Sequence, residues 1–384
     1  MFPSAYLAWC QLSHGRIKLI VASAGVVVAV LLMLMQLGFL RAAYDSTLIV
    51  PRRVSADLII MSSKTPSMFR PTSWSRRLLY RLPAHPAVAS VQAVYLGNAK
   101  WRNPWNREEF SIFVYGLEPF RPLLDFEGLP ERRELMKLPD TVLFDAGSRA
   151  NFGPVSKELE GGRVLPVEVN RRRVEVVGLT RAGVTIGVDG NLVTSDTNFL
   201  RLFPERHVGR IDLGLVELKP GVSAGEVAVE LAAMLGPEAR VLTRSRFQDH
   251  ELKFLRENGP IEFIFMMGTA VGFFIGFVIV YQILHTDVTN HLPQFATMKA
   301  IGFADGYLLR LVLSEGLLLA VFGFFPGLGL ATILYEVAGR VTLLPVEMTL
   351  DRVVLVFSLT IVMCLFSGAI AVRKLRAADP ADVF

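Results

Sequence analysis

The side chains that could perform chemistry form no catalytic pattern in this sequence. None of the six histidines belongs to a His-Glu-x-x-His motif, and the two cysteines do not have zinc-ligand spacing. The sequence also lacks a Gly-Lys-Ser/Thr phosphate loop and a Gly-x-Ser-x-Gly nucleophile elbow. His285 and His291 lie around the end of the apolar segment 263–286, where the chain would leave a membrane, and are better explained as interfacial histidines than as ligands. We therefore expect no catalytic residue, metal site or cofactor in this chain.

Three glycines predict a close helix contact. Gly268, Gly272 and Gly276 occupy every fourth position of an apolar segment. In a helix this spacing places them along one face, where a neighbouring backbone can approach closely. The pattern favours packing between two copies of the chain, and packing against the chain's own helices is the alternative.

A second informative segment is the stretch 291–303. Pro293 suits the first turn of a short helix and Gly302 suits its end, while Phe295 and Met298 fall on one face. An amphipathic helix with few charges is typical of a segment that binds a groove on a partner protein. The alternative is a helix that lies at the surface of a bilayer.

Four apolar stretches without Asp, Glu, Lys or Arg surround these residues. They cover 19–40, 263–286, 316–335 and 353–372, and 52% of the whole chain is hydrophobic. Each stretch is long enough, at about 1.5 Å per residue, to cross roughly 30 Å of hydrocarbon. We therefore predict an α-helical integral membrane protein with four transmembrane helices and a large α+β domain, 41–262, inserted between the first and the second.

Basic residues near the ends of the chain predict its orientation. Both terminal segments, 1–18 and 373–384, carry Lys and Arg, which favour the cytoplasmic side, whereas a long translocated domain is excluded from such a count. The termini and the loop 287–315 are then cytoplasmic, and the domain 41–262 and the loop 336–352 are periplasmic. The predicted location is the inner membrane.

The large domain shows the patterns of both strands and helices. Short apolar or alternating runs bounded by Gly, Pro or Asn predict six strands: 57–61, 88–95, 110–116, 141–144, 173–179 and 211–218. A helix is expected at 223–235, with Ser223 as its cap. We also expect an outer subdomain near 121–209, and a charged helix at 244–260 that continues into the second membrane span.

Basic and aromatic clusters in this domain have two interpretations each. The net charge is +5, and the arginine runs 132–133 and 171–173 form either a solvated face or a contact with anionic lipid head groups or an acidic partner. A periplasmic location excludes nucleic acid. The aromatic residues form either core packing or an exposed contact patch: Tyr95, Trp101, Trp105 and Phe110.

The loop and the tail also resemble a known family. The segment HLPQFATMKAIGF, 291–303, and the Asp-Pro-Ala sequence at 379–381 resemble the permeases of the FtsX and MacB family of ABC transporters. The amino-terminal LAWCQLSHGRIKL and the HLPQ segment resemble DevC-type permeases in particular. Many family members have an Arg-Glu pair where this chain has Pro293 and Gln294.

The resemblance implies a homodimeric permease subunit in the membrane lipid, which works with a separate ATP-binding subunit that holds ATP and Mg²⁺. It also implies a periplasmic membrane-fusion protein, a TolC-like outer-membrane channel and a lipid-like substrate. The loop would be the coupling helix that docks on the ATPase. Its residues at that contact would be Pro293, Gln294, Phe295, Ala296, Met298, Lys299 and Gly302.

Two other functions within the same family stay open. One is an FtsX-like regulator of a cell-wall hydrolase, and the other is a permease that extracts lipoproteins. A membrane-anchored sensor is disfavoured, because no predicted cytoplasmic segment is long enough for a signalling domain.

Overall fold

The protein was analysed as a computed structural model, which describes residues 16–120, 123–160, 163–185 and 187–377. The chain divides into two compact units, 43–259 and the remainder on either side of it. We call the unit 43–259 the sheet domain and the other unit the helix bundle. The predicted terminal segments, 1–18 and 373–384, lie largely outside the described residues.

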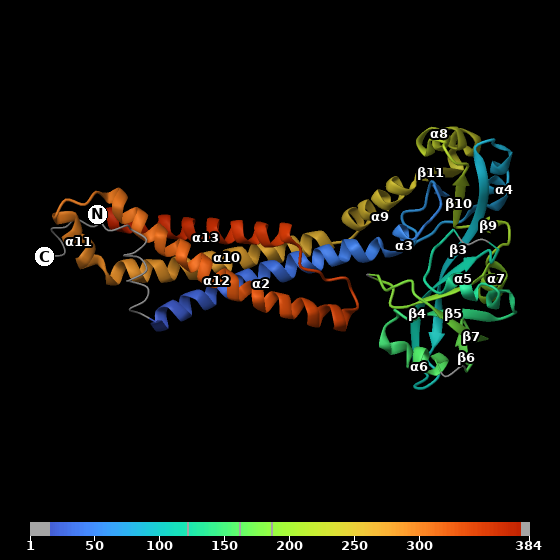
Figure 1. Cartoon of the computed structure of the whole chain (residues 1–384), viewed down its shortest axis with the longest axis horizontal. Coiled ribbons are helices and arrows are strands. Elements are labelled where there is room, and N and C mark those ends of the chain that lie inside the picture. The colour runs from blue at the N-terminus through green and yellow to red at the C-terminus, as the bar shows by residue number, and fades with distance from the viewer. Residues whose placement is uncertain (1–15, 121–122, 161–162, 186, 378–384) are drawn as a thin grey trace. The chain divides into compact units, whose positions relative to one another are not determined.

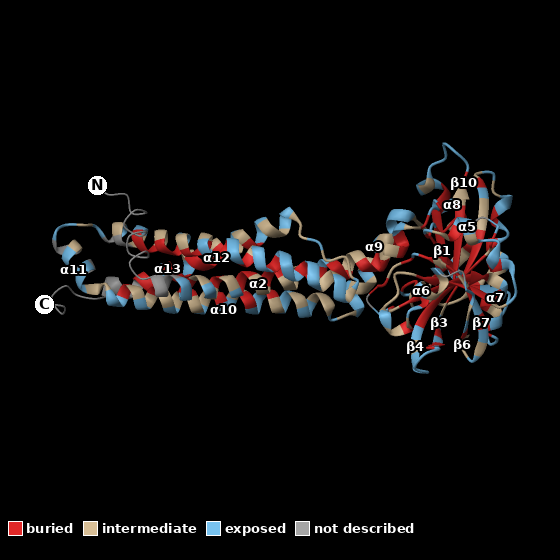
Figure 2. Ribbon diagram, turned by 60° about the horizontal axis from the view of Figure 1, so that its bottom comes forward, coloured by how far each residue is buried: buried red, intermediate tan, exposed pale blue. Residues whose placement is uncertain are grey.

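Four of the described helices are long and apolar enough to cross a membrane. They lie side by side in Figure 1: α2 (Arg16–Thr47), α10 (Ile261–Asn290), α12 (Asp305–Thr342) and α13 (Leu350–Ala377). Each contains one predicted span and extends beyond it at both ends. Figure 2 shows exposed residues along the outside of these helices. Large apolar residues such as Phe263, Phe274 and Val278 are among the exposed ones. Such a surface suits lipid and not water.

The beginning of α12 differs from the prediction. The uncharged stretch 316–335 placed Glu315 at the edge of the third span, but α12 begins at Asp305 and Glu315 is buried inside the helix. The helix also continues without interruption through Pro326. Charge alone therefore predicted a span shorter than the helix, because this carboxyl group is enclosed by neighbouring helices.

The sheet domain contains a nine-stranded mixed sheet in the order β11-β1-β10-β3-β4-β8-β5-β7-β6. The strands are β1 (Leu58–Ser62), β3 (Val88–Arg102), β4 (Glu109–Leu117), β5 (Thr141–Asp145), β6 (Leu165–Val169), β7 (Arg172–Thr180), β8 (Asn191–Ser195), β10 (Leu213–Leu218) and β11 (Ala239–Thr243). A separate small pair is formed by β2 (Trp74–Ser75) and β9 (Arg210–Ile211). The β4–β8 and β5–β7 pairs are parallel. This domain, inserted between two apolar helices, confirms the outline of the predicted fold class.

Strand β3 joins the two parts of the sheet. Its first half pairs with β10, its second half pairs with β4, and Trp101 and Arg102 at its end pair with Val169 and Glu168 of β6. The strands β3, β4, β8, β5, β7 and β6 therefore close into a ring. The range 121–209 supplies β5, β6, β7 and β8 to this ring, and β3 and β4 come from the segment that precedes it.

Helices cover both faces of the sheet. In β1, Leu58 and Ile60 belong to one apolar cluster and Ile59 and Met61 to another, as the period of two in a strand requires. Residues of α6 (Val155–Glu160), α7 (Asp196–Leu202) and α8 (Ala224–Leu235) join the first cluster. Residues of α3 (Ile49–Arg52), α5 (Leu129–Arg132) and α9 (Arg244–Asn258) join the second. The remaining short helices are α4 (Arg76–Leu79) and the 3₁₀ turns Leu82–Ala84, Leu135–Lys137, Ala150–Phe152 and Gly236–Glu238.

Two details of the predicted helices differ from the structure. Ser223 precedes α8, but its side chain donates and accepts no capping hydrogen bond in the described structure. The charged helix α9 ends at Asn258, and Gly259 and Pro260 separate it from α10. The two helices are therefore distinct, because Gly259 adopts an extended conformation with φ −123° and ψ 141°.

Candidate functional site

The predicted coupling segment forms the helix α11 (Leu292–Ala300) between α10 and α12 (Figure 1). Gly302 ends it in the left-handed region, with φ +104°. The Phe303 N–H donates to the Met298 carbonyl at 3.1 Å, and this bond across Gly302 is the mark of a Schellman C-cap. The roles predicted for Pro293 in the first turn and Gly302 at the end match this geometry.

The side chains of α11 have two environments. Met298 is half-buried against a small apolar cluster, Val288, Leu311, Val312 and Val372, contributed by α10, α12 and α13. Pro293, Gln294 and Thr297 are exposed, and Ile301 just beyond the helix is 73% exposed. Met298 therefore packs partly inward, and its predicted contact with a partner stays a prediction. The side chains of Phe295, Ala296 and Lys299 lie outside the described residues.

The exposed residues lie on a single face. Positions 293, 297 and 301 are separated by four residues, so they stack along the helix axis. Ile301 was not among the predicted contact residues, although this spacing in the sequence could have indicated it. We call the set Pro293, Gln294, Thr297 and Ile301 the outer face of α11.

The glycine face of α10 packs within the chain. A methyl group added to Gly276 would lie 2.5 Å from both the Ala29 Cβ of α2 and the Met363 Sδ of α13. Added to Gly272, it would lie 3.2 Å from the Leu32 Cβ of α2. The backbones approach so closely that a side chain at Gly276 has no room. Gly268 has the same role against Gln36, where the added group would lie 2.5 Å from Cδ.

Helix α2 also makes close contacts with glycines of α12. The successive partners of α2 on α10 run backward in sequence, from Ala29 with Gly276 to Gln36 with Gly268, so these helices are antiparallel. On α12, Val30 contacts Gly327 and Val26 contacts Gly323, so α2 and α12 are parallel.

These contacts decide between the two sequence interpretations. The glycine face of α10 is covered by α2 and α13 of the same chain, so the preferred interpretation, packing between two copies through this face, is wrong. The spacing identified the face correctly, but it could not identify the helix that covers it. Two separate spans of the chain supply close contacts to α2.

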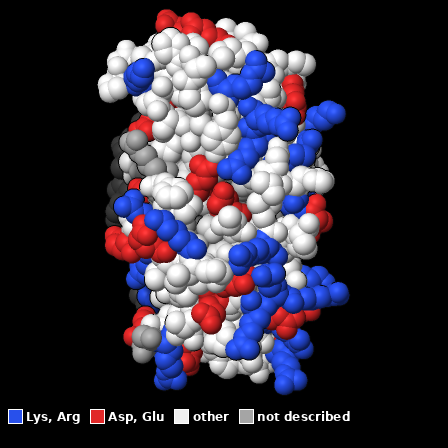
Figure 3. Space-filling model, turned by 90° about the vertical axis from the view of Figure 1, so that its right-hand side faces the viewer, with Lys and Arg blue, Asp and Glu red and all other residues white. Residues whose placement is uncertain are grey.

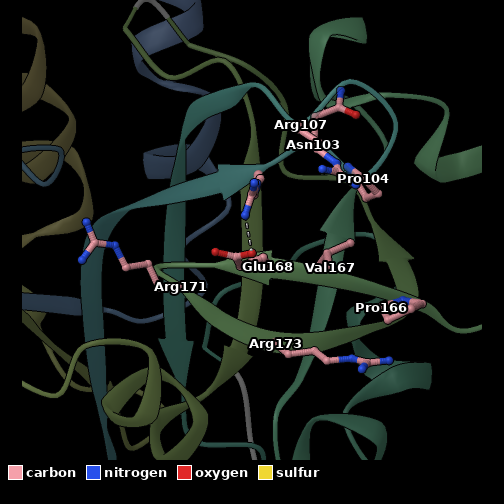
Figure 4. Close-up of a pocket in the computed structure, with 9 residues that line it drawn as sticks. Asn103, Pro104, Arg107, Pro166, Val167, Glu168, Arg171 and Arg173 are labelled. Atoms are coloured by element: carbon pink, nitrogen blue, oxygen red, sulfur yellow. Dashed lines mark hydrogen bonds and ion pairs between the residues drawn. The ribbon is translucent and has the colours of Figure 1, made fainter.

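Arg171 and Arg173 of the second basic run line an open groove of about 540 Å³ in the sheet domain, together with Arg102 and Arg107. Lys and Arg side chains gather along one side of the face seen in Figure 3. In Figure 4, Arg171 and Arg173 point to opposite sides of the groove. Arg102, which also lines the groove, pairs with Glu168 at 3.1 Å. Two guanidinium groups that point away from each other cannot bind the same anion. The arrangement therefore favours the solvated face over a built anion site.

Other arginines of these runs have local partners. Arg172 binds Asp140 through two hydrogen bonds of 2.7 and 3.0 Å, and the hydrogen bond lowers the pKa of the Asp140 carboxyl. Arg132 donates to the Gly128 carbonyl at 3.1 Å. Of the four aromatic residues considered above, Tyr95 and Trp101 are fully buried core residues, whereas Trp105 is exposed. The aromatic contact patch is therefore not formed by Tyr95 or Trp101.

Comparison with known proteins finds a family match for the carboxyl-terminal part of the chain. Residues 266–380, which include α11 and nearly all of α10, α12 and α13, match the family described as FtsX-like permease C-terminal. Residues 266–380 are therefore similar to the C-terminal domain of FtsX-like permeases. The resemblance of this segment to FtsX-like permeases is thus confirmed, and four of the described helices are long and apolar enough to cross a membrane. No curated protein matches the chain by sequence.

Two solved structures resemble about half of this chain. The periplasmic region of MacB from Actinobacillus actinomycetemcomitans shares 13% identity over 52% of this chain and 94% of that one, with a TM-score of 0.37. The extracellular domain of the noncanonic ABC-type transporter YknZ from Gram-positive bacteria shares 16% identity over 49% of this chain and 99% of that one, with a TM-score of 0.34.

Proposed function

We propose that this chain is the permease subunit of an ABC-type exporter and that α11 couples it to a separate ATP-binding subunit. The observation that carries the proposal is the position of α11 inside the FtsX-like permease domain, with an outer face that the bundle leaves exposed. A short helix with Ile301 at 73% exposure offers a small apolar contact for a groove on a partner.

The packing of α11 supports a mechanical role. Met298 contacts a cluster built from α10, α12 and α13, so a force on α11 reaches three membrane helices at once. The close glycine contacts then link α10 and α12 to α2. Tightly packed elements move as units and do not deform gradually. Closure of two ATP-binding subunits would therefore shift the whole bundle, and both α2 and α10 lead in sequence to the sheet domain.

The remaining parts of the proposal follow the DevC-type resemblance. The chain would act as a homodimer in the inner membrane, with both termini in the cytoplasm and the sheet domain in the periplasm. A membrane-fusion protein and a TolC-like channel would carry a lipid-like substrate onward. Since the glycine face of α10 is occupied within the chain, a dimer would use the exposed apolar surface of the bundle.

A single substitution tests the coupling role. Ile301→Asp places a charge on the outer face of α11, and we expect it to reduce stimulation of the co-expressed ATP-binding-cassette subunit at least about tenfold, because a buried unpaired carboxylate opposes docking. The matched control is Val229→Asp on α8, since Val229 is also exposed, at 69%. ATPase activity and pull-down would be measured for both variants in nanodiscs. Equal stimulation by Ile301→Asp and the wild type would remove the coupling role.

A further inference from the structure

Glu315 on α12 is the most unusual polar residue of the helix bundle. Its side chain is 1% exposed, and its Oε1 atom accepts no hydrogen bond from any residue that the structure describes. A carboxylate buried without a partner is costly, so such groups inside membrane helices usually serve a function. The FtsX-like coupling role proposed above does not use this group.

Glu315 lines a cavity of about 270 Å³ between three helices. Val21 and Ala22 of α2, Leu284 of α10 and Leu319 of α12 supply apolar walls. Asp287 of α10 adds a second carboxylate, which already lies 3.5 Å from the Nδ1 atom of His291. The cavity therefore combines hydrocarbon walls with acidic oxygens, of which those of Glu315 are the more deeply buried.

One side of the cavity is polar and open. Gln282, Thr286 and Asn290 follow one another at every fourth position of α10, so they form a polar row on one face. All three are exposed, and Val21 at the opposite wall is 60% exposed. A ligand can therefore enter from the outer surface of the bundle, where lipid surrounds the apolar helices.

The residues that line the cavity determine which class of ligand it can bind. Two carboxylates repel anions, and no group of three His, Cys, Asp or Glu side chains suitable for a metal ion occurs in the described parts of the chain. A primary ammonium group carries three N–H donors, which can satisfy the unpaired oxygen of Glu315 and the oxygens of the polar row. A hydrocarbon portion next to the ammonium would contact the apolar walls.

We infer that this cavity binds the primary ammonium of an aminophospholipid head group, with Glu315 as the acceptor at its inner end. A quaternary ammonium cannot replace it, because it has no N–H to donate. The site requires neither the ATP-binding subunit nor the outer face of α11, so the coupling proposal can fail while this inference stands.

The test uses the delipidated full-length chain and native mass spectrometry. Phosphatidylethanolamine or phosphatidylcholine of the same acyl chains is added at equal concentration, and retained lipid is counted. We expect Glu315→Gln to retain about tenfold less phosphatidylethanolamine than the wild type, the size of one charge-assisted hydrogen bond, and unchanged phosphatidylcholine. The matched control is Glu336→Gln, since Glu336 lies on the same helix, exposed and paired with Arg340.

Two further measurements test the opening of the cavity and the chemical group that it recognises. Val21→Trp obstructs the opening at an exposed position and should lower phosphatidylethanolamine retention without removing the acidic group. Octylammonium, a soluble primary amine, should compete with the lipid and identify the ammonium as the recognised group. Equal retention of phosphatidylethanolamine by Glu315→Gln and the wild type would overturn the inference. Equal retention of the two lipids by the wild type would also overturn it. Failure of octylammonium to displace phosphatidylethanolamine would do the same.

Discussion

The sheet domain and the helix bundle bury carboxyl groups in opposite ways. In the sheet domain, Glu251 on α9 is fully buried and accepts hydrogen bonds from the Ser67 hydroxyl at 2.6 Å and the Met68 N–H at 3.0 Å. In the bundle, Glu315 is buried to the same degree without a described hydrogen bond at Oε1. A buried acid with fixed partners is part of the fold, whereas one without them is available to a ligand.

The same contrast appears at other residues of the sheet domain. Asp145 is fully buried and accepts hydrogen bonds from the backbone N–H groups of Gly147, Ala182 and Gly183, at 2.8 to 3.0 Å. Asp212 accepts from the Leu96 N–H at 2.7 Å. Each of these carboxylates joins loops to the sheet. The bundle instead holds its helices together through small residues and apolar contacts, as membrane helices commonly do.

The largest expected effect concerns the pH dependence of the sheet domain. Burial raises the pKa of Glu251 from 4.5 to about 7, and the hydrogen bonds from Ser67 and Met68 oppose this only in part. The folded state therefore holds a proton that the unfolded chain has released. The contribution of Glu251 to the free energy of unfolding should be fully present below pH 4.5 and should fall by about 3 kcal/mol as the pH rises to 7.

This prediction is checked by urea unfolding of the full chain in detergent between pH 4 and 8, since Trp74 and Trp101 are buried in the sheet domain and report its unfolding. In Glu251→Gln this part of the pH dependence should disappear, because glutamine does not titrate. If the variant and the wild type lost stability in parallel, Glu251 would not be the protonated group, and its contrast with Glu315 would weaken.

A smaller effect is expected in the bundle. Gly276→Ala forces a methyl group toward Ala29 and Met363, so overpacking should lower the free energy of unfolding by about 2 kcal/mol. Gly329→Ala on α12 should change it by less than about 1 kcal/mol, because no described atom outside the local helix backbone lies within 4 Å of the added group. Thermal unfolding in detergent measures both. Equal effects of the two substitutions would mean that the glycine face of α10 is not a packing surface within one chain.

The sequence predicted the positions of helices better than it predicted which helices pack together. Uncharged length was enough to find four membrane helices, because a bilayer excludes charge over a fixed thickness. The same rule misplaced Glu315, since a carboxyl group enclosed by α2, α10 and α12 does not mark a helix end. The spacing of Gly268, Gly272 and Gly276 identified a packing face, but the identity of the covering helix depends on tertiary contacts.

In the sheet domain the missed elements have a common physical cause. Strand β8 is buried along its whole length between β4 and β5, so it lacks the alternation that indicates a strand with one wet face. Strand β3 was predicted to end near Tyr95, because Gly97 and Asn98 resemble a turn. Gly97 instead allows close approach of Phe203, whose ring would lie 2.9 Å from an added methyl group.

The smallest expected effect concerns helix caps, where a capping residue should stabilise the fold only if its side chain makes a hydrogen bond. The Ser195 hydroxyl accepts from the Asn198 N–H at 3.2 Å at the start of α7, whereas Ser223 before α8 makes no capping bond in the described structure. We expect Ser195→Ala to lower the free energy of unfolding by about 1 kcal/mol and Ser223→Ala to lower it by a few tenths at most. Urea unfolding of both variants at one pH gives the comparison. A larger loss for Ser223→Ala would show that residue type at a cap position matters more than the bond, and would undercut the distinction drawn here between partnered and unpartnered polar groups.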